Sequence, residues 1–202
     1  METDGLFRAL YSLEDFPPSL GADTARGRAF RKRVDKQVLI ESFSSDQVLL
    51  EKGKLQKTMY FLDQGFARGF CHDEDTGAEV TLYLWDELSF VVSPYSFYHQ
   101  KPSHIAIEVC AGSKVISATF QDMQAVFAEF PEGEIMTRAV PIHYLEMQEW
   151  RSGMTERMSP EARYKTLLKR FPGVGRHFKT EVIASYVNLA RETVSRLRKF
   201  HD

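Results

Sequence analysis

The segment from Thr180 to Lys199 constrains the fold more than any other part of the chain. It predicts two short helices joined by a tight turn at Asn188, because Asn tolerates a positive φ better than most residues. Each predicted helix has an apolar side, and small Ala184 allows the two helices to approach closely. The segment therefore predicts a helix-turn-helix, a motif whose second helix enters the major groove of DNA.

The second predicted helix carries its polar residues along one edge. At about 100° per residue, a single arc of roughly 140° holds Arg191, Glu192, Ser195 and Arg196. Arg can donate two hydrogen bonds to guanine and Glu can accept one from cytosine, so this edge suits adjacent G·C pairs. The alternative is a solvated amphipathic helix that only closes the core. The turn residue and the matched apolar sides favour the DNA interpretation.

This segment resembles part of a known family. Residues 191–196 (RETVSR) resemble the recognition helix of the Crp/Fnr transcriptional regulators, and residues 183–186 (IASY) resemble the preceding helix of Bacteroidetes-type members. The resemblance implies base contacts by Arg191, Glu192 and Arg196. It implies that the residues near DNA phosphates are Thr180, Thr193, Ser195 and Lys199.

The same resemblance implies partners and shows two departures. The implied partners are double-stranded DNA with a near-palindromic site, a second copy of the chain, and RNA polymerase. Ala190 stands where a capping Ser or Thr is usual, at a cost of about 1 kcal/mol. The chain stops at Asp202, so we expect the β-hairpin wing that often follows the recognition helix to be reduced or absent.

Charge is divided unevenly along the chain. The residues from Pro160 onward hold ten Lys or Arg and four Asp or Glu, a net charge of +6, whereas the first 159 residues carry −8. A basic C-terminal unit on an acidic body fits a unit that contacts DNA phosphates. Chance clustering is the alternative, but the division coincides with the predicted helix-turn-helix.

Composition indicates a globular protein of the cytoplasm. Hydrophobic residues make up 43% of the chain and charged residues 27%, which is not typical of disorder. No apolar run approaches 18 residues and no secretory leader is visible, so we expect no membrane association. Cys71 and Cys110 are far apart and lack metal-site spacing, so we expect reduced thiols and no metal.

The region from residue 36 to residue 119 predicts short strands separated by turns. β-Branched and aromatic residues alternate there, and glycines or polar clusters recur every 8–12 residues, as in a sandwich or barrel. By resemblance this is the jelly-roll of cyclic-nucleotide-binding-like domains. The predicted strands are 38–43, 47–50, 58–63, 67–72, 79–85, 104–109 and 114–120.

The predicted roll lacks what a cyclic nucleotide needs. Family members that bind one use a Gly-Glu-Leu-type turn for the ribose and an Arg for the phosphate. Here Asp86 replaces the Gly, and no Arg occurs between Arg68 and Arg138. Cyclic AMP and cyclic GMP are therefore not expected, because a buried phosphate needs a charged partner. The aromatic residues either fill the roll or line a pocket for another small effector, whose candidate residues are Glu87, Leu88, Phe90, Tyr95, Ser103 and His104.

A long helix is predicted from residue 133 to residue 158, after a short one at 121–130. Residues recurring at alternating spacings of four and three form a heptad seam. The stripe could pack on the roll, but the resemblance favours a parallel dimer helix. Pro141 should either kink this helix or mark its start near Ala139. The predicted seam is Met136, Val140, His143, Met147, Trp150 and Met154.

These observations predict an α+β fold in three parts. They are a jelly-roll sensor (1–131), a dimerisation helix (132–158) and a helix-turn-helix unit (159–202). The predicted function is sequence-specific DNA binding by a homodimeric Crp/Fnr-type regulator, with an unidentified effector. Two alternatives remain: a small-molecule sensor of this fold that does not bind DNA, and a cupin-like enzyme. The enzyme would need three or four converging metal ligands, and no hydrolytic motif is present.

Overall fold

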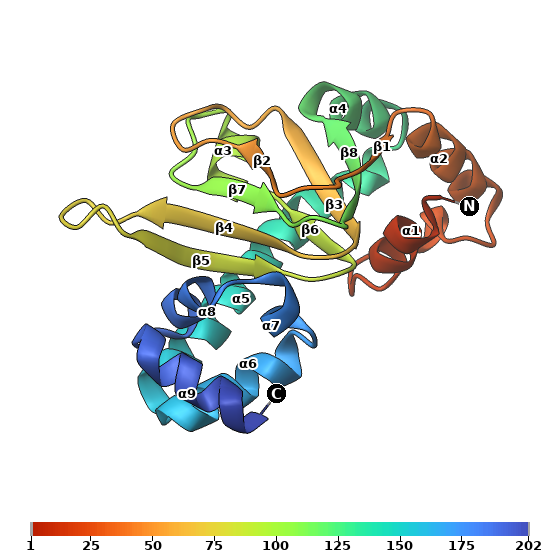
Figure 1. Cartoon of the computed structure of the whole chain (residues 1–202). Coiled ribbons are helices and arrows are strands. Elements are labelled where there is room, and N and C mark those ends of the chain that lie inside the picture. Colours follow the sequence, from red (N-terminus) through yellow and green to blue (C-terminus); the bar gives the residue numbers. More distant parts are fainter. Residues whose placement is uncertain (1, 202) are drawn as a thin grey trace.

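The computed structural model describes residues 2–201 and confirms the predicted α+β fold: a jelly-roll, a long helix and a C-terminal helix-turn-helix (Figure 1). Sheet A has the antiparallel order β1-β8-β3-β6, and sheet B has the order β2-β7-β4-β5. The strands are β1 (Leu39–Ser42), β2 (Gln47–Leu50), β3 (Thr58–Gln64), β4 (Ala67–His72), β5 (Glu79–Trp85), β6 (Ser89–Val91), β7 (Ala106–Val109) and β8 (Lys114–Thr119).

Helices cover one side of the roll and make up the C-terminal part of the chain (Figure 1). They are α1 (Asp4–Tyr11), η1 (Pro18–Leu20), α2 (Ala25–Asp35), α3 (Pro94–His99), α4 (Phe120–Glu129), η2 (Pro131–Ile135), α5 (Met136–Arg157), α6 (Pro160–Arg170), α7 (Val174–His177), α8 (Thr180–Val187) and α9 (Arg191–His201). No helix within residues 2–201 is both long and apolar enough to cross a bilayer.

The alternation of residue types places most strands where the sequence predicts them. Three predicted strands, at 47–50, 67–72 and 79–85, have the bounds of β2, β4 and β5. The others differ from the observed strands only at their ends. Strand β6 and helix α3 are not predicted, because elements this short show no clear period.

The two faces of sheet A belong to different cores. Leu62 of β3 is paired with Val115 of β8, and both point into the roll toward Val109 of sheet B. The next pair along these strands, Phe61 and Ile116, points outward and packs under α1, α2 and α4. Successive residues of a strand face opposite sides, so sheet A separates the roll interior from a second apolar layer.

The C-terminal part, which we call the head (residues 160–201), shares a core with the roll. Tyr164 of α6, Ile183 of α8 and Val194 of α9 are fully buried in the head. The same cluster includes Phe66 and Leu84 from the roll. The head is therefore packed on the roll by apolar contact as well as by the covalent link through α5.

Helix α8 covers the open edge of sheet B at β5 (Figure 1). The backbone N–H of Thr81 donates to Ser185 Oγ at 2.8 Å, and Ser185 Oγ donates to the carbonyl of Glu79 at 3.4 Å. Arg151 of α5 donates from Nε to the carbonyl of Tyr186 at 3.0 Å and from Nη2 to that of Thr81 at 3.3 Å. An edge strand exposes unpaired backbone groups, and these contacts satisfy several of them.

The predicted dimer seam of α5 is largely occupied within the chain. Met136, Val140 and Met154 are only 8%, 6% and 1% exposed, because they pack on the outer layer, the roll and the head. Met147 and Trp150 are partly buried against the roll and the head, and only His143 is exposed. Most of the heptad stripe is therefore buried within one subunit, and its role in a subunit interface stays a prediction.

Another face of α5 is exposed and apolar. Ile142 and Leu145 lie three residues apart and are 55% and 61% exposed. Pro141 lies inside α5, so the alternative that it marks the helix start is wrong. A Pro at this position cannot donate to the carbonyl of Thr137, one turn earlier.

The hydroxyl of Tyr144 joins α5 to the roll by hydrogen bonds. Removing this hydroxyl is the first testable change. It accepts from Val92 N at 2.8 Å and donates to the carbonyl of Phe90 at 3.0 Å, and burial raises its pKa well above the ordinary value. We expect Tyr144→Phe to lower the free energy of unfolding by about 1–3 kcal/mol, because two buried backbone groups lose their partner. Urea unfolding followed by circular dichroism measures this. Tyr95→Phe, at a residue 42% exposed, is the matched control and should change little.

Candidate nucleic-acid interface

The turn between α8 and α9 has the predicted geometry. Asn188 lies in the left-handed region, with φ 52° and ψ 57°. Leu189 N donates to the carbonyl of Ala184 at 2.9 Å, which closes the end of α8 as in a Schellman motif. Arg163 of α6 donates from Nη1 to the carbonyl of Asn188 at 3.0 Å, so the rest of the head holds the turn in place.

Helix α9 has one buried and one exposed side. Val194 and Leu197 are 0% and 9% exposed and face α8 and α6. The polar edge of α9 is exposed and comprises Arg191, Glu192, Ser195, Arg196 and Lys199. The roll contacts α8 and leaves this edge uncovered, so all three predicted base-reading side chains reach solvent.

An ion pair on this edge is not predicted by the sequence. Arg191 Nε lies 2.6 Å from Glu181 Oε1, with the side chains 65% and 55% exposed. The contact joins the start of α9 to the first turn of α8. The contact engages Nε of the guanidinium. Glu181 and Arg191 are ten positions apart and lie on different helices. The spacing of side chains along one helix therefore could not predict the pair.

The predicted phosphate contacts lie in different surroundings. Ser195 and Lys199 are exposed on α9, and Thr193 is half-buried. Thr180 Oγ1 accepts a hydrogen bond from Arg198 Nη1 at 3.3 Å, and Arg198 also donates to the carbonyl of Gly175. Arg198 therefore joins α9 to α7 and to the first residue of α8. The sequence does not predict this role.

The start of α9 shows the predicted missing cap. The carbonyl of Ala190 accepts from Thr193 N at 3.0 Å and Val194 N at 3.2 Å, as expected for the residue preceding a helix. Its methyl side chain offers no acceptor to the first amides of α9. No side-chain cap from residue 190 therefore competes with an anion at this end of α9, and a helix N-terminus favours one.

The six candidate effector residues do not meet in one place. Phe90 points to the outer layer beside Phe61, and Leu88 packs there too. Ser103 is buried and donates to Ser93 Oγ at 3.1 Å. Glu87 is exposed, and the ring centroids of Tyr95 and His104 lie 4.8 Å apart near the surface, so the six residues do not form one pocket.

The roll residues do not fit a cyclic phosphate. Arg68 is the only Arg between Arg33 and Arg138, and its side chain is 9% exposed. Its Nη1 and Nε lie 2.7 Å from carboxylate oxygens of Glu79 and Glu108 respectively. Two carboxylates already neutralise this guanidinium on the outer face of sheet B, so it cannot serve an anion inside the roll.

Solved structures with the same architecture are regulators. The c-di-GMP-responsive global regulator CLP of Xanthomonas campestris aligns with TM-score 0.65 and 13% identity, covering 86% of this chain and 90% of that chain. FixK2 from Bradyrhizobium japonicum aligns with TM-score 0.65 and 17% identity over 81% and 83% of the two chains. A protein from Eubacterium rectale assigned to the Crp/Fnr family aligns with TM-score 0.66 and 14% identity over 93% and 87%.

No protein-family profile matches the sequence, and no curated protein does. At 13–17% identity, the structural matches establish a shared fold. The chain therefore has the fold of the Crp/Fnr-type regulators.

Proposed function

We propose that the protein is a sequence-specific, DNA-binding transcriptional regulator of the Crp/Fnr type that acts in the cytoplasm and has no enzymatic activity. The observation that carries the proposal is the exposed edge of α9, with Arg191, Glu192 and Arg196 on a helix-turn-helix closed by Asn188. The regulatory neighbours of the same fold support it. Its proposed parts are the sensor (1–131), the dimerisation helix (132–158) and the helix-turn-helix unit (159–202), which contains the head.

The chemistry of the edge supports base reading in the major groove. Arg196 offers a planar pair of donors to guanine, and Glu192 offers an acceptor to the amino group of cytosine. Glu181 orients Arg191 before DNA arrives, which lowers the entropy lost when the side chain engages a base. Thr180, Thr193, Ser195 and Lys199 are the proposed phosphate contacts, and the net charge of +6 from Pro160 onward favours the approach to DNA.

A homodimer is part of the proposal, through a face of α5 that differs from the predicted seam. Ile142 and Leu145 form an exposed apolar stripe on α5, and a second copy can cover it. Two heads of a symmetric dimer would meet successive major grooves about 34 Å apart on a near-palindromic site. RNA polymerase is the proposed further partner, and an unidentified small effector the proposed control.

Replacing Arg196 tests base reading directly. We expect Arg196→Ala to weaken binding to the preferred duplex by about 1–3 kcal/mol and to relax the preference at one base pair. Arg196→Lys keeps the charge but loses the two-donor geometry, so it should keep the salt dependence and still lose that preference. Selection from randomised duplexes, followed by mobility-shift titration at several salt concentrations, measures both effects.

The matched control removes an arginine far from the head. Arg8→Ala, at an exposed position of α1, should leave sequence preference and affinity unchanged. An unchanged preference in Arg196→Ala would refute the base-reading assignment. Wild-type protein that binds genomic fragments without a steep salt dependence would favour the alternative, a sensor of the same fold that does not bind DNA.

Replacing Leu145 tests the dimer face. Leu145→Glu places a charge in the proposed apolar interface, so we expect the mass in solution to fall from that of a dimer to that of a monomer. Light scattering coupled to size-exclusion chromatography measures it. Leu39→Glu, at a residue 67% exposed on β1, is the matched control and should leave the mass unchanged. A dimeric Leu145→Glu variant would contradict the proposed interface.

A further inference from the structure

An apolar cavity of about 110 Å³ lies on the outer face of sheet A. Its walls come from α1, α2, β3, β8, α4 and α5, and include Leu10, Phe61, Ile116, Val126 and Met136. Phe61 and Ile116 point away from the roll interior, as their pairing across β3 and β8 requires. The cavity therefore lies against the outward face of β3 and β8, and Val140 at its wall also contacts the roll cluster.

The lining restricts the chemistry of an occupant. Most lining side chains are hydrocarbon, and among residues 2–201 no Lys or Arg lines the cavity. Asp122 at its edge is engaged in the cap of α4, where it accepts from Thr119 N at 3.2 Å. Burial between mainly hydrocarbon walls penalises a charge, so an uncharged occupant fits this lining best.

One lining residue carries a polar atom that lacks a partner. Tyr98 is a lining residue, and its buried Oη has no hydrogen bond within the described part of the chain. Burial raises the pKa of Tyr98, so the phenol stays protonated and can donate. Buried hydroxyls normally find a partner, and an unpaired one calls for an explanation. A ligand acceptor would provide it.

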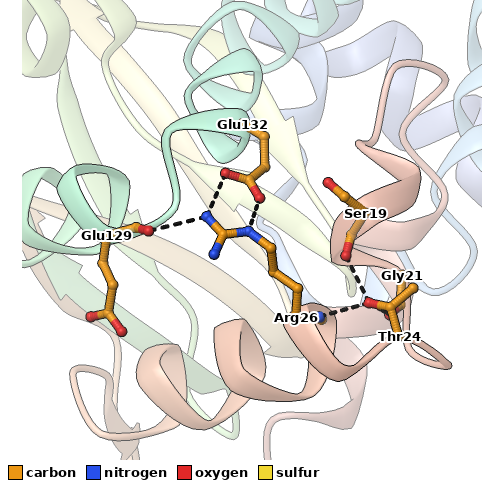
Figure 2. A network of polar contacts seen from close by, with 7 residues as sticks. Ser19, Gly21, Thr24, Arg26, Glu129 and Glu132 are labelled. Atoms are coloured by element: carbon orange, nitrogen blue, oxygen red, sulfur yellow. Dashed lines mark hydrogen bonds and ion pairs between the residues drawn. The ribbon is translucent and has the colours of Figure 1, made fainter.

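Two arginines of α2 pair with the segment formed by α4 and η2. Figure 2 shows Arg26 of α2 reaching Glu132 of η2, with Nη2 at 2.9 Å from Oε2, and the carbonyl of Glu129 at 3.2 Å. Arg33 Nε lies 3.0 Å from Glu129 Oε2. These contacts fix α2 relative to α4, and both helices contribute side chains to the cavity wall. Apolar cavities of about this size stay dry and can bind a benzene-sized molecule.

We propose that this cavity is a binding site for a small, uncharged, mainly apolar molecule about the size of a substituted benzene, whose one acceptor oxygen pairs with Tyr98. The ligand restores the packing contacts that the empty space lacks and gives the buried phenol its missing acceptor. The site is distinct from the six residues that the sequence grouped as an effector pocket, of which only Phe90 lines it.

Two probes of matched shape, ethylbenzene and acetophenone, test the site. They differ by one carbonyl, and titration of the intact protein followed by its methyl NMR signals gives the affinity of each. We expect saturable binding of both. Tyr98→Phe should weaken acetophenone about five-fold, as the loss of one hydrogen bond predicts, and leave ethylbenzene unchanged. An equal effect on both probes would overturn the role of Tyr98.

A second variant fills the cavity with a larger side chain. Ala118 of β8 lines the space, and Ala118→Leu should abolish binding of both probes. Ala22→Leu, at an exposed loop position, is the matched control and should bind like the wild type. Absence of saturable ethylbenzene binding to wild type, or unchanged binding to Ala118→Leu, would overturn the site. These titrations use protein alone, so they stand whether or not the protein binds DNA.

The position of the site also points to regulation, a step that rests on the proposed DNA function. Met136 and Val140 of α5 line the cavity, and further along α5 Arg151 holds α8 of the head. Saturating ethylbenzene should change the affinity of wild type for its preferred duplex and leave that of Ala118→Leu unchanged. Equal affinity with and without ethylbenzene would overturn the coupling and leave the binding site standing.

Discussion

The unpaired edge of β5 is the constraint on which the arrangement of the molecule depends. An edge strand must be covered or blunted, and here α8 covers it through the hydroxyl of Ser185, with Arg151 reaching the carbonyls of both elements. Once α8 faces β5, its partner helix must lie on the side away from the roll. The exposure of the polar edge of α9 thus follows from the need to satisfy a strand in the sensor.

Arginine serves opposite purposes in the two parts of the chain. Arg68 is buried between Glu79 and Glu108, and removing either carboxylate would leave a desolvated charge. Arg191 is exposed, and its ion pair with Glu181 is a surface contact worth little free energy. The roll uses its one guanidinium for its own structure, whereas Arg191 and Arg196 on the edge of α9 reach solvent. This difference supports a regulator that reads DNA and does not sense a cyclic phosphate.

Local signals predict the fold well, and long-range packing explains what they miss. The alternation of β-branched and aromatic residues predicts the bounds of β2, β4 and β5, and Asn188 predicts the turn. Both signals depend only on residues that are neighbours in the sequence. The heptad stripe of α5 is also read correctly as apolar, but periodicity cannot say what covers it. Val140 meets the roll and Met154 the head. The Arg191–Glu181 pair and the cavity beneath α2 depend on elements meeting in space, which no single helix encodes.

Helix α5 joins the three features that matter for function. Its first turns contact the cavity through Met136 and Val140, its middle is fixed to the roll by Tyr144, and its later part holds α8 through Arg151. Helices transmit displacement because their backbone hydrogen bonds resist local change, whereas Pro141 removes one such bond between the cavity and Tyr144. The helix is therefore weakest just after the segment that a cavity ligand would press. A shift there can be absorbed at Pro141 or passed to the head, and the strength of the Tyr144 contacts decides which.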